Sequence, residues 1–205
     1  MSKAQGGRLD NFNPTSCRTA GRPAARSKPM PTATKVIAPL TYMFADDGII
    51  PNNPALPLVL YKGGIDLSGS PDPEKVIEKT FAANGWRDMW CNGIFRYVQY
   101  HSTIHEAMGV ARGRAMVRFG GENGEEIELA AGDVVILPAG TGHQLVTQIR
   151  ELVVVGAYPG SGKYDLCRGS KAEHAKALAA IANVPRPATD PVFGSQGPLI
   201  ALWKA

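Results

Sequence analysis

The chain has 205 residues, which is enough for one domain of ordinary core size plus tails and too few for two typical domains to be expected. No apolar run approaches the roughly 20 residues needed to cross a membrane, so we expect no membrane partner. The net charge of +4 is uneven: residues 1–35 carry +6, so the rest of the chain sums to −2, which argues against a nucleic-acid partner.

The basic segment of residues 1–35 is rich in Gly, Pro, Ser and Ala and lacks apolar side chains to bury. Such a composition predicts a disordered tail, with weak attachment to an acidic partner as the alternative. Met30 is a second candidate for the true start of the protein. We expect residues 36–205 to form a single domain.

The next elements in the chain are two strands and a helix. Alternating apolar residues predict a strand over 36–44, which the turn residues Asp46, Asp47 and Gly48 close, and residues 56–61 predict a second strand. Asp72 before Pro73 is a typical helix start, and Gly85 is placed to end that helix.

Residues 93–157 are dense in short strands, which is typical of a sandwich or barrel. Alternation predicts a strand from Phe95 to His101, a polar corner, and a strand that restarts at Glu106 and turns at Gly113. Asn123-Gly124 predicts a hairpin with a type I′ turn. Further short strands are expected around residues 127–129, 134–137, 145 and 152–155.

The C-terminal part is expected to hold one more helix and one more strand. Ser170 and Glu173 have the spacing of a capping box and predict a helix to about residue 182. We interpret His174, on this helix, as a solvated residue without a chemical role. Residues 198–203 are interpreted as a final strand.

Two segments of the strand-rich region carry histidines, a glutamate and glycines at fixed spacings. Imidazole and carboxylate groups from adjacent strands can converge on one point. The segments are Glu106-x6-Gly113 and Gly132-x5-Pro138-x-Gly140-x2-His143.

This joint pattern resembles the two motifs of the cupin superfamily. The first motif of that family normally also supplies two histidines as His-x-His, which here falls on Gln99 and His101, so one ligand is missing. Flanking residues between about 40 and 203 resemble the YjlB-like branch, which has no settled function. The resemblance implies an all-β dominated fold, the cupin double-stranded β-helix or jelly roll, with a few peripheral helices and core motifs within 93–147.

The resemblance also implies a metal site. His101, Glu106 and His143 form a two-histidine-one-carboxylate set, which suits one divalent transition metal such as Fe, Mn, Ni or Zn. Gln99 could add a weak oxygen ligand or bond a metal-bound water, or the site could have lost its metal. His105 is the rival ligand, but strand parity predicts that it points away if Glu106 points in.

Two function classes follow from this site. The first is a mononuclear-metal enzyme, of oxygenase or isomerase type, acting on a small organic molecule; the second is a metal-free ligand-binding or sensor module. Trp90, Phe95 and Tyr97 are candidate pocket walls, and Arg112 or Arg118 could hold a substrate carboxylate.

Cysteine usage bears on the location of the protein. Cys17, Cys91 and Cys167 form no Cys-x-x-Cys spacing, and no apolar secretory segment opens the chain. A cytoplasmic location is therefore expected, and a homodimer is the working expectation for the oligomeric state.

Overall fold

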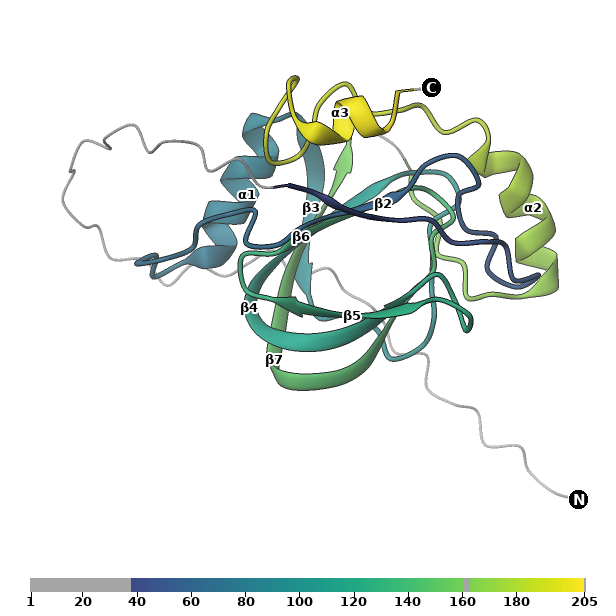
Figure 1. Cartoon of the computed structure of the whole chain (residues 1–205), viewed down its shortest axis with the longest axis horizontal. Coiled ribbons are helices and arrows are strands. Elements are labelled where there is room, and N and C mark those ends of the chain that lie inside the picture. Colours follow the sequence, from purple (N-terminus) through teal and green to yellow (C-terminus); the bar gives the residue numbers. More distant parts are fainter. Residues whose placement is uncertain (1–37, 161–162, 205) are drawn as a thin grey trace, which may run out of the picture.

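One seven-stranded antiparallel sheet dominates the computed structural model, which describes residues 38–160 and 163–204. The strand order is β1-β2-β6-β4-β7-β3, and β5 pairs with the distal half of β4. The long strands β4 and β7 bend strongly, so that the sheet curls around an interior (Figure 1). The strands are β1 (Leu40–Tyr42), β2 (Leu58–Tyr61), β3 (Trp86–Asn92), β4 (Glu106–Phe119), β5 (Glu125–Ala130), β6 (Val134–Leu137) and β7 (His143–Pro159).

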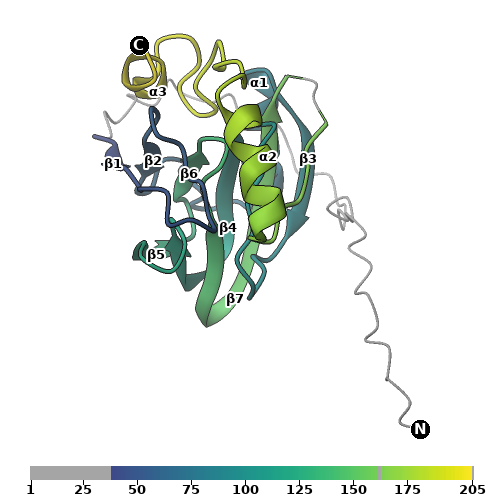
Figure 2. The same ribbon diagram turned by 90° about the vertical axis from the view of Figure 1, so that its right-hand side faces the viewer.

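Three helices, α1 (Pro73–Ala83), α2 (Lys171–Ile181) and α3 (Pro198–Leu202), lie outside the sheet. Figures 1 and 2 show α1 and α3 at the same end of the molecule and α2 alongside the strands. The predicted β-dominated fold with a few peripheral helices is confirmed. Within the described residues no helix has both the length and the apolar character needed to cross a membrane. The predicted tail, residues 1–35, lies outside the described residues.

Alternation along the strands produces two apolar cores, one on each face of the sheet. Inside the curl, Leu58, Met108 and Val135 belong to a buried cluster with other side chains of β4, β5, β6 and β7. On the outer face, Val59 and Ala107 join a second cluster that the helices cover. This parity decides which way each residue at the start of β4 points.

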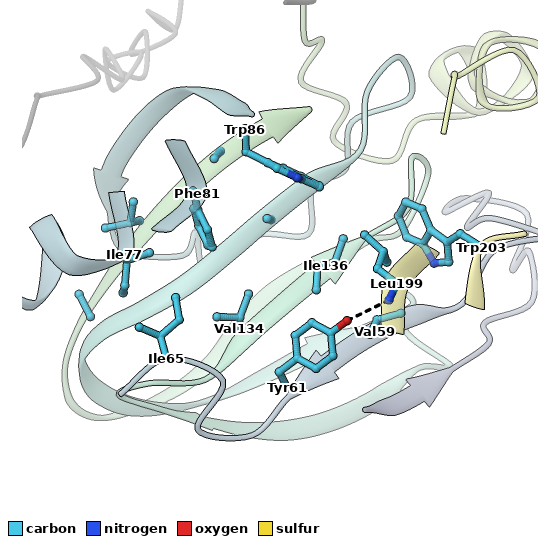
Figure 3. Packing of buried hydrophobic residues seen from close by; sticks show 14 of the residues in the cluster. Val59, Tyr61, Ile65, Ile77, Phe81, Trp86, Val134, Ile136, Leu199 and Trp203 are labelled. Atoms are coloured by element: carbon cyan, nitrogen blue, oxygen red, sulfur yellow. Dashed lines mark hydrogen bonds between the residues drawn. The ribbon is translucent and has the colours of Figure 1, made fainter. Parts of the chain in front are cut away.

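The outer cluster joins the sheet to α1 and α3 (Figure 3). Ile77 and Phe81 of α1 pack directly over Gly109 of β4, where an added Cβ atom would lie 2.7 Å from Ile77 Cγ2. The helix can approach this closely because Gly109 has no side chain. Trp86 of β3 and Trp203 after α3 complete the layer.

The C-terminal segment is a helix, so the predicted final strand is wrong. Leu199 and Trp203 are four residues apart and share one helical face, which buries both in the outer cluster. The first turn of α3 is fixed by Asp190, whose buried carboxylate accepts hydrogen bonds from the Leu199 N–H and the Tyr61 hydroxyl. Figure 3 shows the Tyr61 hydroxyl directed at the Leu199 nitrogen.

The predicted strand from Phe95 to His101 is also wrong. Its backbone makes isolated bridges, Gln99 with His143 and Tyr100 with Cys167, and the strand of this region is β3, which lies earlier in the chain. Gln99 and His101 nevertheless both line the cavity described below, as their shared parity predicted.

Two predicted turns differ in detail. β4 continues through Gly113, whose positive φ of 82° falls among shifts in the pairing register with β7, so this glycine makes a bend within the strand. The hairpin after β4 has five residues between the paired Phe119 and Glu125, with positive φ at Gly120 and Gly121. It is therefore longer than the predicted two-residue type I′ turn.

The predicted helix starts are confirmed. Asp72 caps α1 by accepting from the Lys75 N–H, and Ser170 and Glu173 form the capping box of α2. His174 on α2 is not a free solvated residue, because its Nε2 lies 2.7 Å from Asp46 Oδ1. It ties α2 to the turn that follows β1.

Candidate metal-binding pocket

A cavity of about 390 Å³ opens at one end of the curled sheet. Its deep part holds Gln99, His101, Glu106 and His143, each at most 8% exposed. Its walls are mainly aromatic and aliphatic. They consist of Asp88, Met89, Trp90, Gly93, Ile94, Phe95, Met108, Tyr158, Tyr164 and Leu166.

Glu106 occupies the centre of the polar group. It shares the inward parity of Met108 on β4, and its side chain is 3% exposed. His101 Nε2 lies 3.6 Å from Glu106 Oε1, and His143 Nε2 lies 4.0 Å from Glu106 Oε2. The structure therefore brings together the three residues that the two sequence motifs predict as ligands.

His101 is oriented by a backbone group. Its Nδ1 donates to the carbonyl oxygen of Asp165, so Nε2 is the ring nitrogen that faces Glu106. A hydrogen bond of this kind fixes the tautomer of a metal-ligating histidine and the direction of its ring.

The Asp165 carboxylate also holds the turn that follows His101. It accepts from the backbone N–H and the hydroxyl of Ser102, at 2.8 and 2.5 Å, and from the hydroxyl of Thr103 at 3.0 Å. These bonds hold the pKa of Asp165 at about 2, although burial opposes ionisation. Asp165 was not identified from the sequence, since nothing in the pattern of residues 160–169 relates it to His101.

Gln99 lies against the second histidine. Its Nε2 is 3.1 Å from His143 Nε2, while its Oε1 is buried without a hydrogen-bond partner. Rotating the amide by half a turn would exchange these two atoms and turn the oxygen toward the site. Gln99 is therefore adjacent to the ligand set, in the position where the family pattern has a histidine.

Trp90 reaches Glu106 from β3. Its Nε1 donates to Glu106 Oε1 at 3.3 Å. The indole lies over Gly156 of β7, where an added Cβ atom would be only 2.0 Å from Trp90 Cε2. Gly156 thus makes room for the tryptophan that bonds the central carboxylate.

The charges of the site are coupled. Burial opposes ionisation of Glu106, but His101 and His143 outweigh it and hold the pKa of this carboxyl below its usual value. Burial also disfavours protonation of His101, yet the Glu106 carboxylate raises the His101 pKa above its usual value. Burial lowers the pKa of His143.

His105 lies outside the lining of this cavity. Its Nδ1 accepts from the Ala139 N–H at 2.9 Å, and its ring packs on Trp203 with a centroid distance of 4.7 Å. Burial, and then the charge of Arg186, lowers the His105 pKa to about 4. The ring is therefore a neutral part of the outer core and not a member of the ligand group around Glu106.

The arginines proposed to hold a substrate carboxylate lie elsewhere. Arg112 pairs with Glu74 and Arg118 with Glu126, and neither lines the cavity. Tyr97 also lies outside the lining and carries the guanidinium of Arg168 over its ring. The walls that sequence reasoning missed include Asp88 and Met89 of β3 and, further along the chain, Tyr158, Tyr164 and Leu166, and only the fold brings these residues to the cavity.

The residues present fit a metal ion, although they do not form a closed coordination shell. Among residues 38–160 and 163–204, no three His, Cys, Asp or Glu side chains already have the spacing of a bound metal. Ligands of one ion at about 2.1 Å lie roughly 3 to 4 Å apart, which is the separation of Glu106 from the two histidine nitrogens. Glu106 Oε2, buried and without a hydrogen-bond partner, completes the fit.

The family comparison agrees with the fold. A family model described as cupin matches residues 80–205. The YjlB protein of Bacillus subtilis (strain 168), which is uncharacterised, is 38% identical over 163 residues, covering 80% of this chain and 95% of that protein.

Solved structures give weaker likenesses. Acireductone dioxygenase from Bacillus anthracis, solved with a cadmium ion in its active centre, is 16% identical over 62% of this chain and 80% of that one, with a TM-score of 0.36. Oxalate decarboxylase of Bacillus subtilis is 19% identical over 55% of this chain and 22% of that one, with a TM-score of 0.31. Likenesses of this strength carry no argument about the reaction.

Proposed function

The chain belongs to the cupin family, in its YjlB-like branch, and we propose that its pocket binds one divalent transition-metal ion through His101, Glu106 and His143. The observation that carries this proposal is the Glu106 carboxylate. It is almost fully buried, and within the described residues its partners in ion-pair range are the two histidines. A buried anion needs a positive charge close by, and a metal supplies it.

A metal held by these three residues would leave coordination positions open toward the cavity, where it would polarise a small organic molecule or support its oxidation. The chain itself supplies the rest of the site. Asp165 orients His101, Trp90 bonds Glu106, and apolar walls exclude water from the carboxylate. The proposed reaction type is that of an oxidoreductase or isomerase.

The test is the metal content of protein produced without added metal and then incubated with Fe(II), Mn(II), Ni(II) or Zn(II). We expect about one equivalent of metal per wild-type chain and strong depletion in Glu106→Gln and His143→Ala. His174→Ala, which removes a histidine on α2 outside the cavity lining, is the matched control. Circular dichroism should show that all variants keep their strands.

The second candidate is a metal-free small-ligand binding module. It is favoured by the contact of the Gln99 amide nitrogen with His143 Nε2, because this contact occupies the lone pair that a metal would use. Wild-type protein that retains none of the four metals would overturn the metal site and make this alternative the better account. The cytoplasmic location and the homodimer stay predictions.

A further inference from the structure

Tyr158 places a hydroxyl group beside the proposed metal ligands. The residue lines the cavity and is 3% exposed. Its hydroxyl oxygen lies 3.5 Å from His101 Nε2, and the hydroxyl also interacts with the Glu106 carboxylate. The spacing to Nε2 is close to the 3.6 Å between that nitrogen and Glu106 Oε1. The hydroxyl therefore adjoins the proposed ligand set at His101 and Glu106.

The position of this hydroxyl is fixed by β7 and by two neighbouring rings. Tyr158 pairs with Arg87 of β3, and the preceding residue Ala157 belongs to the outer cluster, so strand parity directs Tyr158 inward. The Tyr158 ring stacks on the Tyr164 ring, with a centroid distance of 5.1 Å and an interplanar angle of 14°. It meets the His101 ring edge-on. The hydroxyl therefore cannot turn away from His101 without disturbing this packing.

The Tyr158 hydroxyl would lose its partner on His101 when that histidine holds a metal. His101 Nδ1 bonds the Asp165 carbonyl, so Nε2 is the nitrogen available both to the hydroxyl and to a metal. A ring nitrogen has a single lone pair and cannot serve both. Because Tyr158 is buried, a hydroxyl that has lost its partner costs free energy unless another group bonds it. The loaded site therefore gives this hydroxyl a need for a new acceptor.

The charge of the loaded site decides which kind of acceptor fits. Two neutral imidazoles and one carboxylate leave part of the charge of a divalent ion uncompensated, and a buried charge is costly without a counter-charge. Among the described residues that line the cavity, the other carboxylate is the exposed Asp88, and neither lysine nor arginine is present. An anion at the metal therefore needs a neutral donor for its remaining lone pairs. Tyr158 offers one on the His101 side, whereas Gln99 lies against His143.

We propose that Tyr158 is a specificity-determining residue of this pocket, whose hydroxyl selects a carboxylate ligand. One oxygen of that carboxylate would bind the metal, and the other would accept the hydrogen bond of the Tyr158 hydroxyl. Tyr158 stays protonated throughout and is not itself a metal ligand. This inference rests on the proposed function, because it needs a metal at His101, Glu106 and His143.

The experiment measures acetate binding by calorimetry to the full-length protein, loaded with whichever of Fe(II), Mn(II), Ni(II) and Zn(II) the wild type retains. Acetate is the probe because its second oxygen can accept a hydrogen bond. Imidazole is the comparison probe, since it binds a metal through one nitrogen and its other nitrogen carries a proton, so it offers Tyr158 no acceptor. Acetate should bind the loaded protein and not protein from which a chelator has removed the metal.

Tyr158→Phe removes the hydroxyl and keeps the ring, so circular dichroism should match that of wild type. Its acetate affinity should fall about tenfold, as expected for one hydrogen bond to a charged group, while its imidazole affinity should stay within about twofold of wild type. Its metal affinity, measured by chelator competition, should stay within about threefold, because the hydroxyl is not a ligand. Tyr97→Phe removes a hydroxyl that bonds Arg168 at 3.1 Å outside the cavity lining, and it is the matched control.

The outcomes separate this proposal from the metal site. Equal acetate affinity of loaded wild type and Tyr158→Phe, equal losses of acetate and imidazole, or acetate binding without metal would overturn the role of Tyr158 alone. Metal depletion in Tyr158→Phe as strong as in Glu106→Gln would make Tyr158 a ligand and also overturn it. Wild-type protein that retains no metal would overturn the metal site, and the role of Tyr158 with it.

Discussion

The backbone carbonyl of Asp165 accepts a hydrogen bond from His101 Nδ1, and the carboxylate of the same residue holds the turn that follows His101. One residue thus fixes both the ring and the backbone of a proposed ligand. The two are 64 positions apart in the chain, so this relationship exists only in the folded protein.

Asp165→Ala should weaken metal binding without unfolding the barrel. The variant keeps the carbonyl but loses the carboxylate bonds to Ser102 and Thr103, so the carbonyl is no longer held under His101. Loss of such an orienting group costs about 10- to 100-fold in metal affinity. Competition with a chromogenic chelator measures it, and Asp66→Ala, which removes an aspartate from an exposed loop turn, should change nothing.

Metal affinity should rise with pH through and above the ordinary histidine range. The Glu106 carboxylate raises the His101 pKa despite burial, so the proton on His101 competes with the metal below that raised value and is displaced on binding. Calorimetry in buffers of different ionisation enthalpy should find about one proton released near neutral pH. Affinity that is flat from pH 6 to 8 would contradict the proposed role of His101.

Gln99→His should raise metal affinity. The side chain at this position already touches His143 Nε2, so an imidazole there would supply the nitrogen that the family pattern has and this chain lacks. We expect a gain of at least about tenfold, measured by the same chelator competition. Gln99→Leu, which has similar bulk and no donor atom, is the matched control. Equal affinities for wild type and Gln99→His would show that residue 99 does not contact the metal.

His105 should make the protein less stable as pH falls. Its pKa is about 4 in the folded state against an ordinary value of 6.5, so the unfolded chain binds the extra proton between these values. The free energy of unfolding is therefore higher above pH 6.5 and falls as pH drops toward 4. At 1.36 kcal/mol per pH unit, the loss attributable to His105 is about 3 kcal/mol.

Urea unfolding of wild type and His105→Asn at pH 7 and pH 5 checks how strongly the free energy of unfolding depends on pH. The asparagine can still accept from the Ala139 N–H but does not titrate, so its stability should depend less on pH. Metal content of the variant should stay near that of wild type, because His105 does not line the cavity. Depletion as severe as in His143→Ala would move His105 into the ligand set.

Gly156→Ala should destabilise the protein by about 1–3 kcal/mol and displace Trp90. The new methyl group would overlap the indole, which would break its bond to Glu106. Thermal unfolding and tryptophan fluorescence report the two effects. Gly93→Ala is the matched control, since Gly93 also lines the cavity but its nearest atom to an added Cβ is 3.8 Å away. A harmless Gly156→Ala would mean that Trp90 is not fixed by this contact.

Local patterns in the sequence determined the starts of α1 and α2, the strand density of the barrel and the motif residues that meet in the pocket. Each of these depends on neighbours within a few positions: Asp72 bonds its own helix, and Glu106 takes its inward direction from strand parity with Met108. Parity also predicted the outward direction of His105.

The tertiary structure decided the rest. Residues 198–203 could have formed a strand by composition, but Asp190 and Tyr61 bind the first turn and the outer core buries Leu199 and Trp203 on one face. The partners of His101 and the aromatic walls come from segments distant in the chain, and no local pattern carries their contacts. Sequence alone therefore supplied the proposed ligand residues, while the packing of distant segments decided their orientation and the composition of the pocket around them.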